Sequence, residues 1–412
     1  MSPTLVVGAG IIGTTIAYML QRRGETVVLI DRDQPGRGAS YGNMASIAVS
    51  EFTPASRPGI LAQMPKWLLD PEGPVRVRPA YMPKLIPWFL RFLAASRPSK
   101  LRELEAAGAL LCGRVHEDLA ALLADTGLQH MLSSEGCLSL YADEAEFSAD
   151  RDHLKALGHF GFRHEVLGGN AIRDLEPALS TKIAKAVLLP DNRSISDPYK
   201  LVTALAEAFQ RLGGTFVQGD VIGFEHGDGG VAALRLKDGR RFEADRTVLA
   251  AGAYTARLSA MLREPIPLET ERGYHTQIMA PGISMRHSII WPARAFMVTP
   301  TAGGIRVGGT VEMAGLDAPP DYRRAKVLVK RAKEALPGLE VEQTSEWMGH
   351  RPALPDTVPI MGRSVKCRNV YYATGHGHLG LTLAATAGRL MADLITGATP
   401  PLAMDAYRVD RF

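Results

Sequence analysis

The sequence contains little cysteine and no long apolar segment. Cys112, Cys137 and Cys367 are the only cysteines among 412 residues, and they lie far apart. They form no C-x-x-C pair and no metal-ligand spacing, so we expect a reducing compartment and neither a disulfide scaffold nor a metal site. The sequence lacks a run of about 18 apolar residues, which argues against a membrane span. A strand-like segment begins by Leu5, so we expect no signal peptide and a cytoplasmic location.

An excess of charge of one sign is also missing. Lys and Arg number 47 and Asp and Glu number 43, which gives a formal net charge of +4. Such a diffuse charge does not predict a nucleic-acid partner. It is compatible with a small anionic substrate or with an anionic membrane surface. The length of the chain allows a large core and favours two domains.

The beginning of the chain does contain a nucleotide-binding pattern. Residues 5–7 predict a buried parallel strand, residues 14–23 a helix and residues 26–30 a second strand. Between the first strand and the helix lie three glycines in G-x-G-x-x-G spacing: Gly8, Gly10 and Gly13. The first glycine permits a tight turn, the second lets a pyrophosphate approach the backbone, and the third lets the helix pack closely on the strand.

This pattern predicts a cofactor that contains ADP. The N-terminus of the helix offers free N–H groups and a positive dipole end to the phosphates. Asp31 follows Gly13 by 18 residues and can accept hydrogen bonds from a ribose diol. An ordinary glycine-rich β-α-β turn is the alternative. The motif alone does not distinguish FAD from NAD.

Two later segments offer further places for a cofactor. Residues 33–48 predict a loop of small residues, in which Ser40 and Asn43 can hydrogen-bond a flat ligand. An ordinary Gly/Ser-rich loop is the alternative at this position. Residues 247–251 predict an apolar strand that ends at Gly252, where backbone can again approach a cofactor.

Near the C-terminal end, the order strand, glycine-rich turn and helix occurs once more. Residues 370–374 predict a strand, residues 375–382 (GHGHLGLT) a Gly/His turn and residues 384–396 a helix. The N-terminus of such a helix suits a negative or electron-rich group.

The middle of the chain predicts helices and an antiparallel sheet. The helical segments are residues 101–126, 144–157 and 198–212, and residues 268–310 alternate as antiparallel strands do. Residues 322–335 predict a charged, amphipathic helix on the surface, and the proline-rich residues 347–362 predict irregular structure.

Residues 81–95 (YMPKLIPWFLRFLAA) predict an amphipathic helix with two interpretations. The helix can be buried against the rest of the domain, or it can lie in a membrane interface with its basic residues at the lipid surface. Both interpretations require the same periodicity, so the sequence does not separate them.

Taken together, these segments resemble the FAD-dependent D-amino acid oxidase/dehydrogenase superfamily, and most closely the D-amino acid dehydrogenase small subunit family. The resemblance runs almost from end to end, and its last two stretches are the most specific and favour FAD over NAD. The matching stretches are VVGAGIIG from Val6, AAG from Ala250, RGYHTQ from Arg272, IRVGG from Ile305, RPALPDTVPIMGR from Arg351 and TGHGHLGLTLA from Thr374.

The resemblance implies an α/β protein with two domains. One is a doubly wound, Rossmann-type FAD-binding domain, expected over residues 1–50, 185–260 and 345–412. The other is a substrate domain with a mixed antiparallel sheet and helices, expected over residues 51–184 and 261–344.

It also implies how the cofactor is held. The glycine motif and Asp31 hold the ADP half, Ser40 to Ala45 run beside the flavin ring, and the backbone at Val221 meets the adenine. The turn at 377–382 presents N–H groups to the pyrimidine edge of the flavin. The implied cofactor residues are Gly8, Gly10, Ile11, Ile12, Gly13, Asp31, Arg32, Ser40, Gly42, Asn43, Met44, Ala45, Val221, Ala251, Gly252, Gly377, His378, Leu379, Gly380, Leu381 and Thr382.

Arg351 matches the superfamily's substrate-carboxylate arginine. A guanidinium group binds a carboxylate through two parallel hydrogen bonds and so fixes the α-carbon of the substrate under the flavin. The alternative for Arg351 is a structural ion pair with Asp356 or Glu346.

Three further catalytic candidates follow from the same comparison. Tyr274 can donate to the substrate carboxylate, although a buried structural tyrosine is the alternative. His378 can polarise the flavin. Arg294, with Phe296 nearby, stands where the dehydrogenase pattern tends to have a tyrosine, which leaves the particular amino acid open.

The implied reaction is oxidation of a D-amino acid by hydride transfer from Cα to flavin N5. The product is an imino acid, which hydrolyses to a 2-oxo acid and ammonia, and the electrons pass to a quinone or carrier. The alternatives are a cis-4-hydroxy-D-proline dehydrogenase, a glycine/sarcosine-type oxidase that makes hydrogen peroxide, an NAD-dependent dehydrogenase and a non-catalytic FAD-binding subunit. A quinone acceptor favours peripheral membrane contact through residues 81–95, on the inner face of the cell membrane. A homo- or hetero-oligomer stays open.

Overall fold

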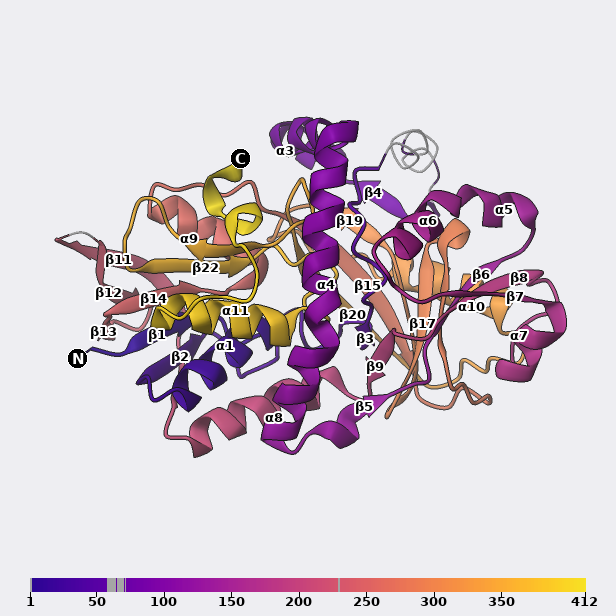
Figure 1. Cartoon of the computed structure of the whole chain (residues 1–412), viewed down its shortest axis with the longest axis horizontal. Coiled ribbons are helices and arrows are strands. Elements are labelled where there is room, and N and C mark those ends of the chain that lie inside the picture. Colours follow the sequence, from indigo (N-terminus) through magenta and orange to yellow (C-terminus); the bar gives the residue numbers. More distant parts are fainter. Residues whose placement is uncertain (1, 58–63, 65–69, 71, 229) are drawn as a thin grey trace.

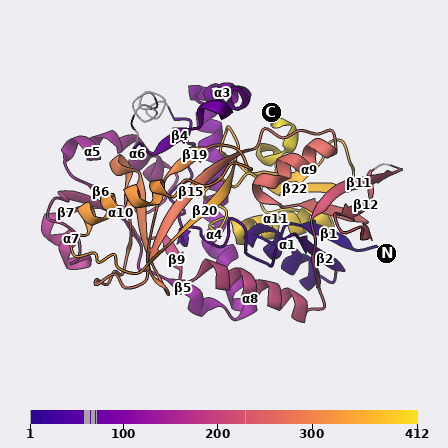
Figure 2. The same ribbon diagram turned by 180° about the vertical axis from the view of Figure 1, so that it is seen from behind.

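The computed structural model describes residues 2–57, 64, 70, 72–228 and 230–412. Figure 1 shows two sheets side by side, with the long helix α4 (Pro98–Thr126) running between them. The view from behind shows the same arrangement (Figure 2). Among the helices within these residues, none is long and apolar enough to cross a bilayer.

The smaller sheet, at the left of Figure 1, has the strand order β10-β2-β1-β14-β22-β21. All neighbours are parallel except β21, which runs antiparallel to β22. Along β1, Val6 packs into one apolar cluster while Leu5 and Val7 pack into another, so both faces of the sheet are buried. The strands are β1 (Thr4–Val7), β2 (Val27–Asp31), β10 (Thr215–Gln218), β14 (Arg246–Leu249), β21 (Ile360–Arg363) and β22 (Val370–Thr374).

Helices cover one face of this sheet, and a three-stranded meander with one helix covers the other. Helix α1 begins at Ile11, earlier than predicted, because the extended Gly10 ends the turn and its carbonyl accepts from the Thr14 N–H at 2.9 Å. The elements are α1 (Ile11–Arg22), α8 (Pro198–Arg211) and α11 (Ala384–Thr396) on one side, and β11 (Val221–Gly227), β12 (Gly230–Leu236), β13 (Arg241–Glu243) and α9 (Thr255–Met261) on the other.

The larger sheet has ten strands and mixed direction. Its path is β4-β19-β15-β18-β17-β16-β6-β8-β7, and β20 pairs with β15 beside this path. The β16/β6 and β19/β4 pairs are parallel and the others antiparallel. The strands are β4 (Val75–Val77), β6 (Cys137–Tyr141), β7 (Glu165–Gly168), β8 (Lys185–Leu189), β15 (Glu269–Ile278), β16 (Ser288–Trp291), β17 (Phe296–Thr301), β18 (Gly304–Gly308), β19 (Val311–Met313) and β20 (Thr344–Ala353).

The prediction of irregular structure over residues 347–362 is wrong for its first part. Strand β20 pairs with β15 along ten residues, from Thr344 to Ala353. Prolines make this strand hard to recognise in the sequence, but within the described residues β20 pairs with one strand, β15, and an edge strand tolerates proline. Strands β8 and β20 both pair within the larger sheet, although they fall in segments predicted for the FAD domain. The division of the chain into two domains stays a prediction.

The remaining elements surround the larger sheet and α4. Helix α10 (Arg323–Ala335) packs Leu328 and Ala332 onto the sheet, so only its other side is exposed as predicted. The helix predicted over residues 144–157 is divided in two at Asp150. The other elements are α3 (Met82–Ala95), α5 (Glu144–Ala149), α6 (Arg151–His159), α7 (Gly169–Leu175), β3 (Ser46–Ile47), β5 (Leu132–Ser133) and β9 (Arg193–Ile195).

Candidate active site

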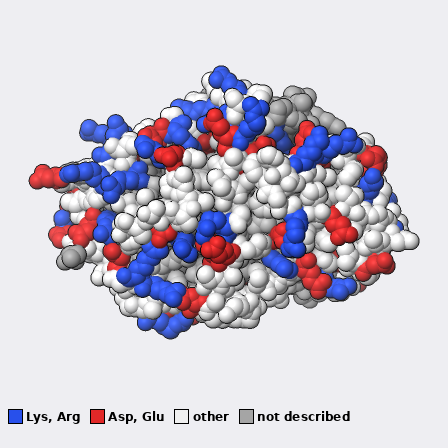
Figure 3. Space-filling model, in the orientation of Figure 1, with Lys and Arg blue, Asp and Glu red and all other residues white. Residues whose placement is uncertain are grey.

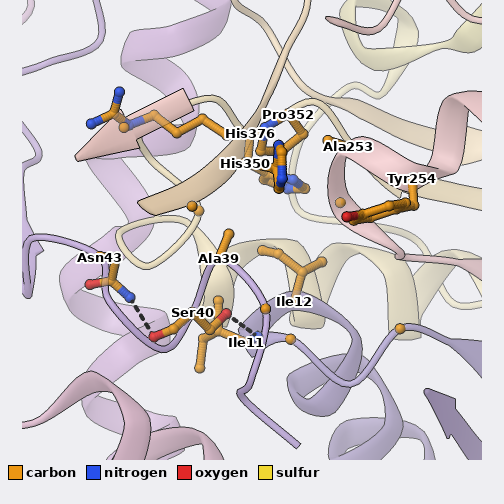
Figure 4. A pocket seen from close by; sticks show the side chains of 18 of the residues that line it. Ile11, Ile12, Ala39, Ser40, Asn43, Ala253, Tyr254, His350, Pro352 and His376 are labelled. Carbon is orange, nitrogen blue, oxygen red and sulfur yellow. Dashed lines mark hydrogen bonds between the residues drawn. The ribbon is translucent and has the colours of Figure 1, made fainter. Parts of the chain in front are cut away.

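A cavity of about 810 Å³ lies between the two sheets. Its walls come from the carboxyl ends of β1, β2 and β14, from the loop after β2, and from β15 and β20. Figure 4 shows the cavity with Ile11, Ser40 and Asn43 on one side and with His350 and His376 on the other. Open α/β sheets bind their ligands at this position, outside the carboxyl ends of the strands.

The glycine motif lets neighbouring backbone segments pack closely, because Gly8 and Gly13 have no side chains to hold them apart. A Cβ on Gly13 would lie 1.8 Å from the carbonyl oxygen of Gly8, and one on Gly8 would lie 2.4 Å from that of Ala250. Gly8 also has a φ of +108°, which glycine adopts at little cost. The turn is therefore closed against any side chain, and the N-terminus of α1 faces the cavity.

Asp31 is the last residue of β2, and Arg32 follows it in the chain. Asp31 accepts hydrogen bonds from the Ala9 N–H at 2.6 Å and from the Asp33 N–H at 3.0 Å. Burial raises the pKa of Asp31, and the two N–H donors lower it. The guanidinium of Arg32 lies over the ring of Tyr254, 3.8 Å from its centroid. A ribose and an adenine can be held between these groups and Val221, which also lines the cavity.

Most predicted cofactor residues line the cavity. Four of them, Gly13, Ala45, Leu379 and Thr382, lie outside its lining. Thr382 acts within the protein, because its Oγ1 accepts a hydrogen bond from the Ala48 N–H at 3.0 Å. This bond connects the segment after β2 to the Gly/His turn. The residues in the lining are Gly8, Gly10, Ile11, Ile12, Asp31, Arg32, Ser40, Gly42, Asn43, Met44, Val221, Ala251, Gly252, Gly377, His378, Gly380 and Leu381.

Ser40 and Asn43 use their side chains within the protein. The Ser40 hydroxyl accepts from the Ile11 N–H at 2.9 Å, and the Asn43 amide donates to the Ser40 carbonyl at 3.0 Å and accepts from the Ala45 N–H (Figure 4). These bonds shape the loop after β2. The loop thus offers a cofactor its fixed backbone rather than free side-chain donors.

The residues fit a dinucleotide cofactor. The cavity combines the glycine turn, an acidic strand end and the N-terminus of a helix. In addition, His376 lines this cavity, and its buried Nε2 has no hydrogen-bond partner among the described residues. A buried polar atom of this kind is costly unless a ligand or water pairs with it.

Arg351 reaches the cavity from β20. It stands directly opposite Glu271 of β15, two residues from Gly273. A Cβ on Gly273 would lie 2.4 Å from Cζ of Arg351, so the guanidinium lies over this glycine. Its Nη1 donates to the Thr310 carbonyl at 3.0 Å. Burial lowers the pKa of Arg351, and Glu271 raises it.

The alternative ion pairs for Arg351 are not formed. Asp356 is paired with Arg411 at 2.8 Å, and Glu346 is exposed. The guanidinium of Arg351 therefore keeps donors that can face a ligand in the cavity.

The structure engages the Tyr274 hydroxyl within the protein and puts Arg294 outside the cavity lining, and the catalytic roles expected of both stay predictions. Tyr274 borders the cavity, but its hydroxyl donates to Glu312 at 2.6 Å and accepts from the Asp321 N–H at 2.9 Å. Strand alternation is the reason, because the side chain at 274 points to the opposite face from Gly273. Arg294 is exposed in a short 3-10 turn and lies 3.9 Å from Glu334.

The histidines around the cavity are held neutral. Burial lowers the pKa of His376 to about 3 and that of His350 to about 4. Burial also lowers the pKa of His378, with a smaller contribution from Arg351. His378 keeps accessible surface, and since it lines the cavity this surface faces a ligand. The predicted polarising role of His378 stays a prediction.

Sequence reasoning missed two carboxylates and a tryptophan. Glu51, Glu271 and Trp347 all line the cavity. The signal for Glu271 was the alternation of β15, which puts it on the same face as Gly273. That Glu271 stands beside Arg351 becomes visible only when residues 347–351 are recognised as part of a strand.

Fold and cavity together define a doubly wound α/β protein that binds a dinucleotide. The protein contributes the glycine turn, Asp31 at the end of β2, and Arg351 to the wall of this binding cavity. The chain belongs to the FAD dependent oxidoreductase family, which it matches over residues 4–394. The prediction of FAD as the cofactor is confirmed.

Relatives match the chain over nearly its whole length. The D-amino-acid oxidase of Bradyrhizobium diazoefficiens is 32% identical, over 99% of this chain and 98% of the relative. The D-amino acid dehydrogenase of Xanthobacter autotrophicus is 30% identical, with the same coverage. Glycine oxidase from Geobacillus kaustophilus is similar in structure, with a TM-score of 0.79 at 20% identity, over 100% of this chain and 99% of that one. The predicted superfamily and fold class are confirmed.

Proposed function

We propose that this protein oxidises a D-amino acid at its α-carbon and acts as a dehydrogenase. The product is an imino acid, which water hydrolyses to a 2-oxo acid and ammonia. The observation that carries the proposal is the guanidinium of Arg351, which reaches the cavity and is bonded there to one carbonyl, that of Thr310. Relatives with the names D-amino-acid oxidase and D-amino acid dehydrogenase support the substrate class.

Each part of the cavity has a task in this proposal. Arg351 holds the substrate carboxylate through two parallel hydrogen bonds and so fixes the α-carbon. FAD, when bound, supplies the acceptor for the two electrons that leave the substrate. An apolar wall keeps water from the reacting carbon, formed by Ile290, Phe296, Met297, Val311, Trp347 and Met348.

A substrate panel tests the proposal. Purified holoenzyme is given D- and L-amino acids, glycine, sarcosine and cis-4-hydroxy-D-proline, with a dye as electron acceptor and with hydrogen peroxide measured in parallel. We expect turnover of D-amino acids with the dye and little peroxide. Turnover of L-amino acids alone would reject the substrate class, and rapid peroxide formation without dye would reject the dehydrogenase.

The exposed surface of helix α3 favours an electron acceptor that is located in a membrane. The helix lies at the outer edge of the molecule in Figures 1 and 2, and only Leu85, Phe92 and Ala95 are buried. Lys and Arg side chains stand around it, as the upper edge of Figure 3 shows. Four of its large apolar side chains are exposed, at Met82 (44%), Ile86 (52%), Leu90 (60%) and Leu93 (37%), while Trp88 and Phe89 are half-buried. An apolar helix face edged by basic residues is typical of an interfacial helix.

This helix is also close to the cavity. Trp88 donates its indole N–H to the Ala353 carbonyl at 3.2 Å. Ala353 bridges to His376, which lines the cavity. A quinone delivered along α3 would therefore arrive near the cofactor, which supports a quinone as the electron acceptor.

Vesicle binding tests the membrane contact. We expect wild-type protein to co-sediment with phosphatidylglycerol vesicles and Leu90→Asp to lose this binding while its dye-linked activity stays. The matched control is Leu212→Asp, which changes another exposed leucine (45%) at the end of α8, at the opposite edge of the molecule (Figure 1). Absence of wild-type binding would reject the contact.

A further inference from the structure

Glu271 is a carboxylate that the reaction described above does not use. It lies in β15 and lines the cavity. Among the described residues it has no hydrogen-bond or ion-pair partner. Glu271 is half-buried, and a carboxylate removed from part of its water without a hydrogen bond in return is unfavourable for the protein alone, so its place in the cavity wall points to a ligand.

The position of Glu271 relative to Arg351 is well defined. The two residues are direct cross-strand partners on β15 and β20, and such partners have Cβ atoms roughly 5 Å apart. They share the cavity face with Gly273, over which the guanidinium lies. An anion and a cation thus stand side by side in one wall. An α-amino acid carries its carboxylate and its amino group on one carbon, so its two charges are presented side by side in the same way.

Two other carboxylates in this region do not stand beside Arg351. Glu51 also lines the cavity, but its charge raises the pKa of His378. The pKa of Arg351 is raised by Glu271 instead. Glu312 belongs to β19 and stands opposite Arg272, where it accepts a hydrogen bond from the Tyr274 hydroxyl. Glu271 is therefore the carboxylate beside the arginine.

We propose that Glu271 binds the α-amino group of the substrate beside Arg351 and accepts its proton. In this step one N–H bond of the ammonium breaks, and the proton forms an O–H bond with the carboxylate. A neutral amine and a neutral carboxylic acid result, and no electrons are transferred. The amine nitrogen then has the lone pair that oxidation of the α-carbon requires. This inference rests on the proposed function, because it takes Arg351 as the carboxylate site.

The surroundings of Glu271 are suited to proton transfer. From β20 it faces Arg351, and from β19 it faces the uncharged Met313. Its chain neighbour Arg272 points to the other side, where it contacts the carbonyl of Gly315. His275, on the same face of β15, is neutral because burial lowers its pKa to about 3. Burial raises the pKa of Glu271 while Arg351 lowers it, which favours a group able to take up a proton.

The test compares two ligands that differ only in the amino group. D-alanine has both charges and propionate has the carboxylate alone; if the panel finds a faster D-amino acid, that substrate and its deaminated acid replace this pair. Dissociation constants come from the perturbation of the flavin spectrum and from anaerobic flavin reduction, in holoenzyme with FAD content checked. The variant is Glu271→Gln. The matched control is Glu346→Gln, which makes the same change at an exposed position of β20.

We expect Glu271→Gln to weaken the binding of D-alanine about tenfold or more. Propionate binding should stay the same or become tighter, because a nearby negative charge is removed. The rate of flavin reduction at pH 7 should fall and should recover as the pH rises toward the pKa of the free amine. Equal weakening of both ligands, or no change for D-alanine, would overturn the assignment.

A separate variant shows whether the proposed function itself has failed. Arg351→Met should weaken both ligands, since both have a carboxylate. If Arg351→Met leaves propionate binding unchanged, the carboxylate site is wrong and the inference for Glu271 falls with it. If Arg351→Met weakens both ligands and Glu271→Gln weakens neither, only the role of Glu271 is rejected.

Discussion

The two faces of strand β15 differ in how their charges are paired. On the face that carries Arg272 and Tyr274, Arg272 donates to the carbonyls of Gly315 at 2.9 Å and Pro319 at 3.2 Å, and it lies 3.5 Å from Glu312. On the cavity face, Arg351 of the paired strand donates to one carbonyl and Glu271 has no partner among the described residues.

This difference separates structural charge from charge that is available for a ligand. Buried charges are stable when hydrogen bonds replace their hydration, as they do around Arg272. Charges left without such partners are typical of functional sites. Neighbouring positions of one strand therefore have different consequences when they are changed, and the following predictions use that contrast.

The largest effect on stability is expected on the paired face. Arg272→Met removes the carbonyl contacts and leaves Glu312 with less compensation, and both side chains are at most 1% exposed. We expect the free energy of unfolding to fall by about 3–5 kcal/mol, measured by urea unfolding. The control is Arg323→Met, which breaks an ion pair whose arginine is 82% exposed and should cost at most about 1 kcal/mol. Equal losses in both variants would contradict the contrast.

Gly273→Ala should disturb the position of Arg351 without unfolding the protein. The added Cβ would lie 2.4 Å from Cζ of Arg351, so the guanidinium must move. Overpacking of this kind costs about 1–3 kcal/mol, and we expect kcat/KM to fall correspondingly while the FAD content stays. Gly362→Ala in β21 is the control, because no heavy atom lies within 4 Å of its Cβ. Unchanged kinetics for Gly273→Ala would show that the guanidinium is not confined there.

His275 should make stability depend on pH in the acidic range. Its Nδ1 contacts the Gly42 carbonyl at 2.7 Å, and burial lowers its pKa from 6.5 to about 3. The unfolded chain therefore binds a proton that the folded protein does not, and stability falls as the pH drops from 6.5 toward 3. The slope for one such group is about 1.4 kcal/mol per pH unit.

His275→Asn keeps a donor for the carbonyl and removes the titration. Urea midpoints between pH 5 and 6.5 should then decrease less steeply than in the wild type. The exposed His226, replaced in the same way, is the matched control. An unchanged slope in His275→Asn would mean that this histidine does not contribute.

The smallest effect on stability is expected for Arg351→Met. Within the described part of the chain Arg351 makes one hydrogen bond, so an apolar side chain at this position removes a desolvation cost that the protein alone compensates little. We expect the free energy of unfolding to change by less than about 1 kcal/mol or to rise, in contrast to Arg272→Met. A loss of several kcal/mol would place Arg351 with the structural arginines.

The cofactor half of the site was predictable because its signals are local. The glycine turn, the strand before it and Asp31 lie within one short stretch, and each glycine has a backbone reason at its own position. The limits of helix α1 were less certain, since Gly10 decides its start through an extended conformation.

The substrate half was less predictable because two distant strands build it. Residues 269–278 and 344–353 pair with each other, and this register decides that Arg351 lies beside Glu271 and over Gly273. Without the register, Tyr274 could be taken for a cavity donor, and strand alternation turns its hydroxyl to Glu312 instead. The exposed turn that carries Arg294 also has no local signal in the sequence.

The central claim is that Arg351 is the carboxylate site of the cavity. The most direct measurement is the dissociation constant of propionate from the holoenzyme, followed by the flavin absorption spectrum, for wild type, Arg351→Lys and Arg351→Met. We expect Arg351→Met to weaken binding by about 30-fold or more, with Arg351→Lys between the two. An Arg351→Met holoenzyme that binds propionate as tightly as the wild type would contradict the claim.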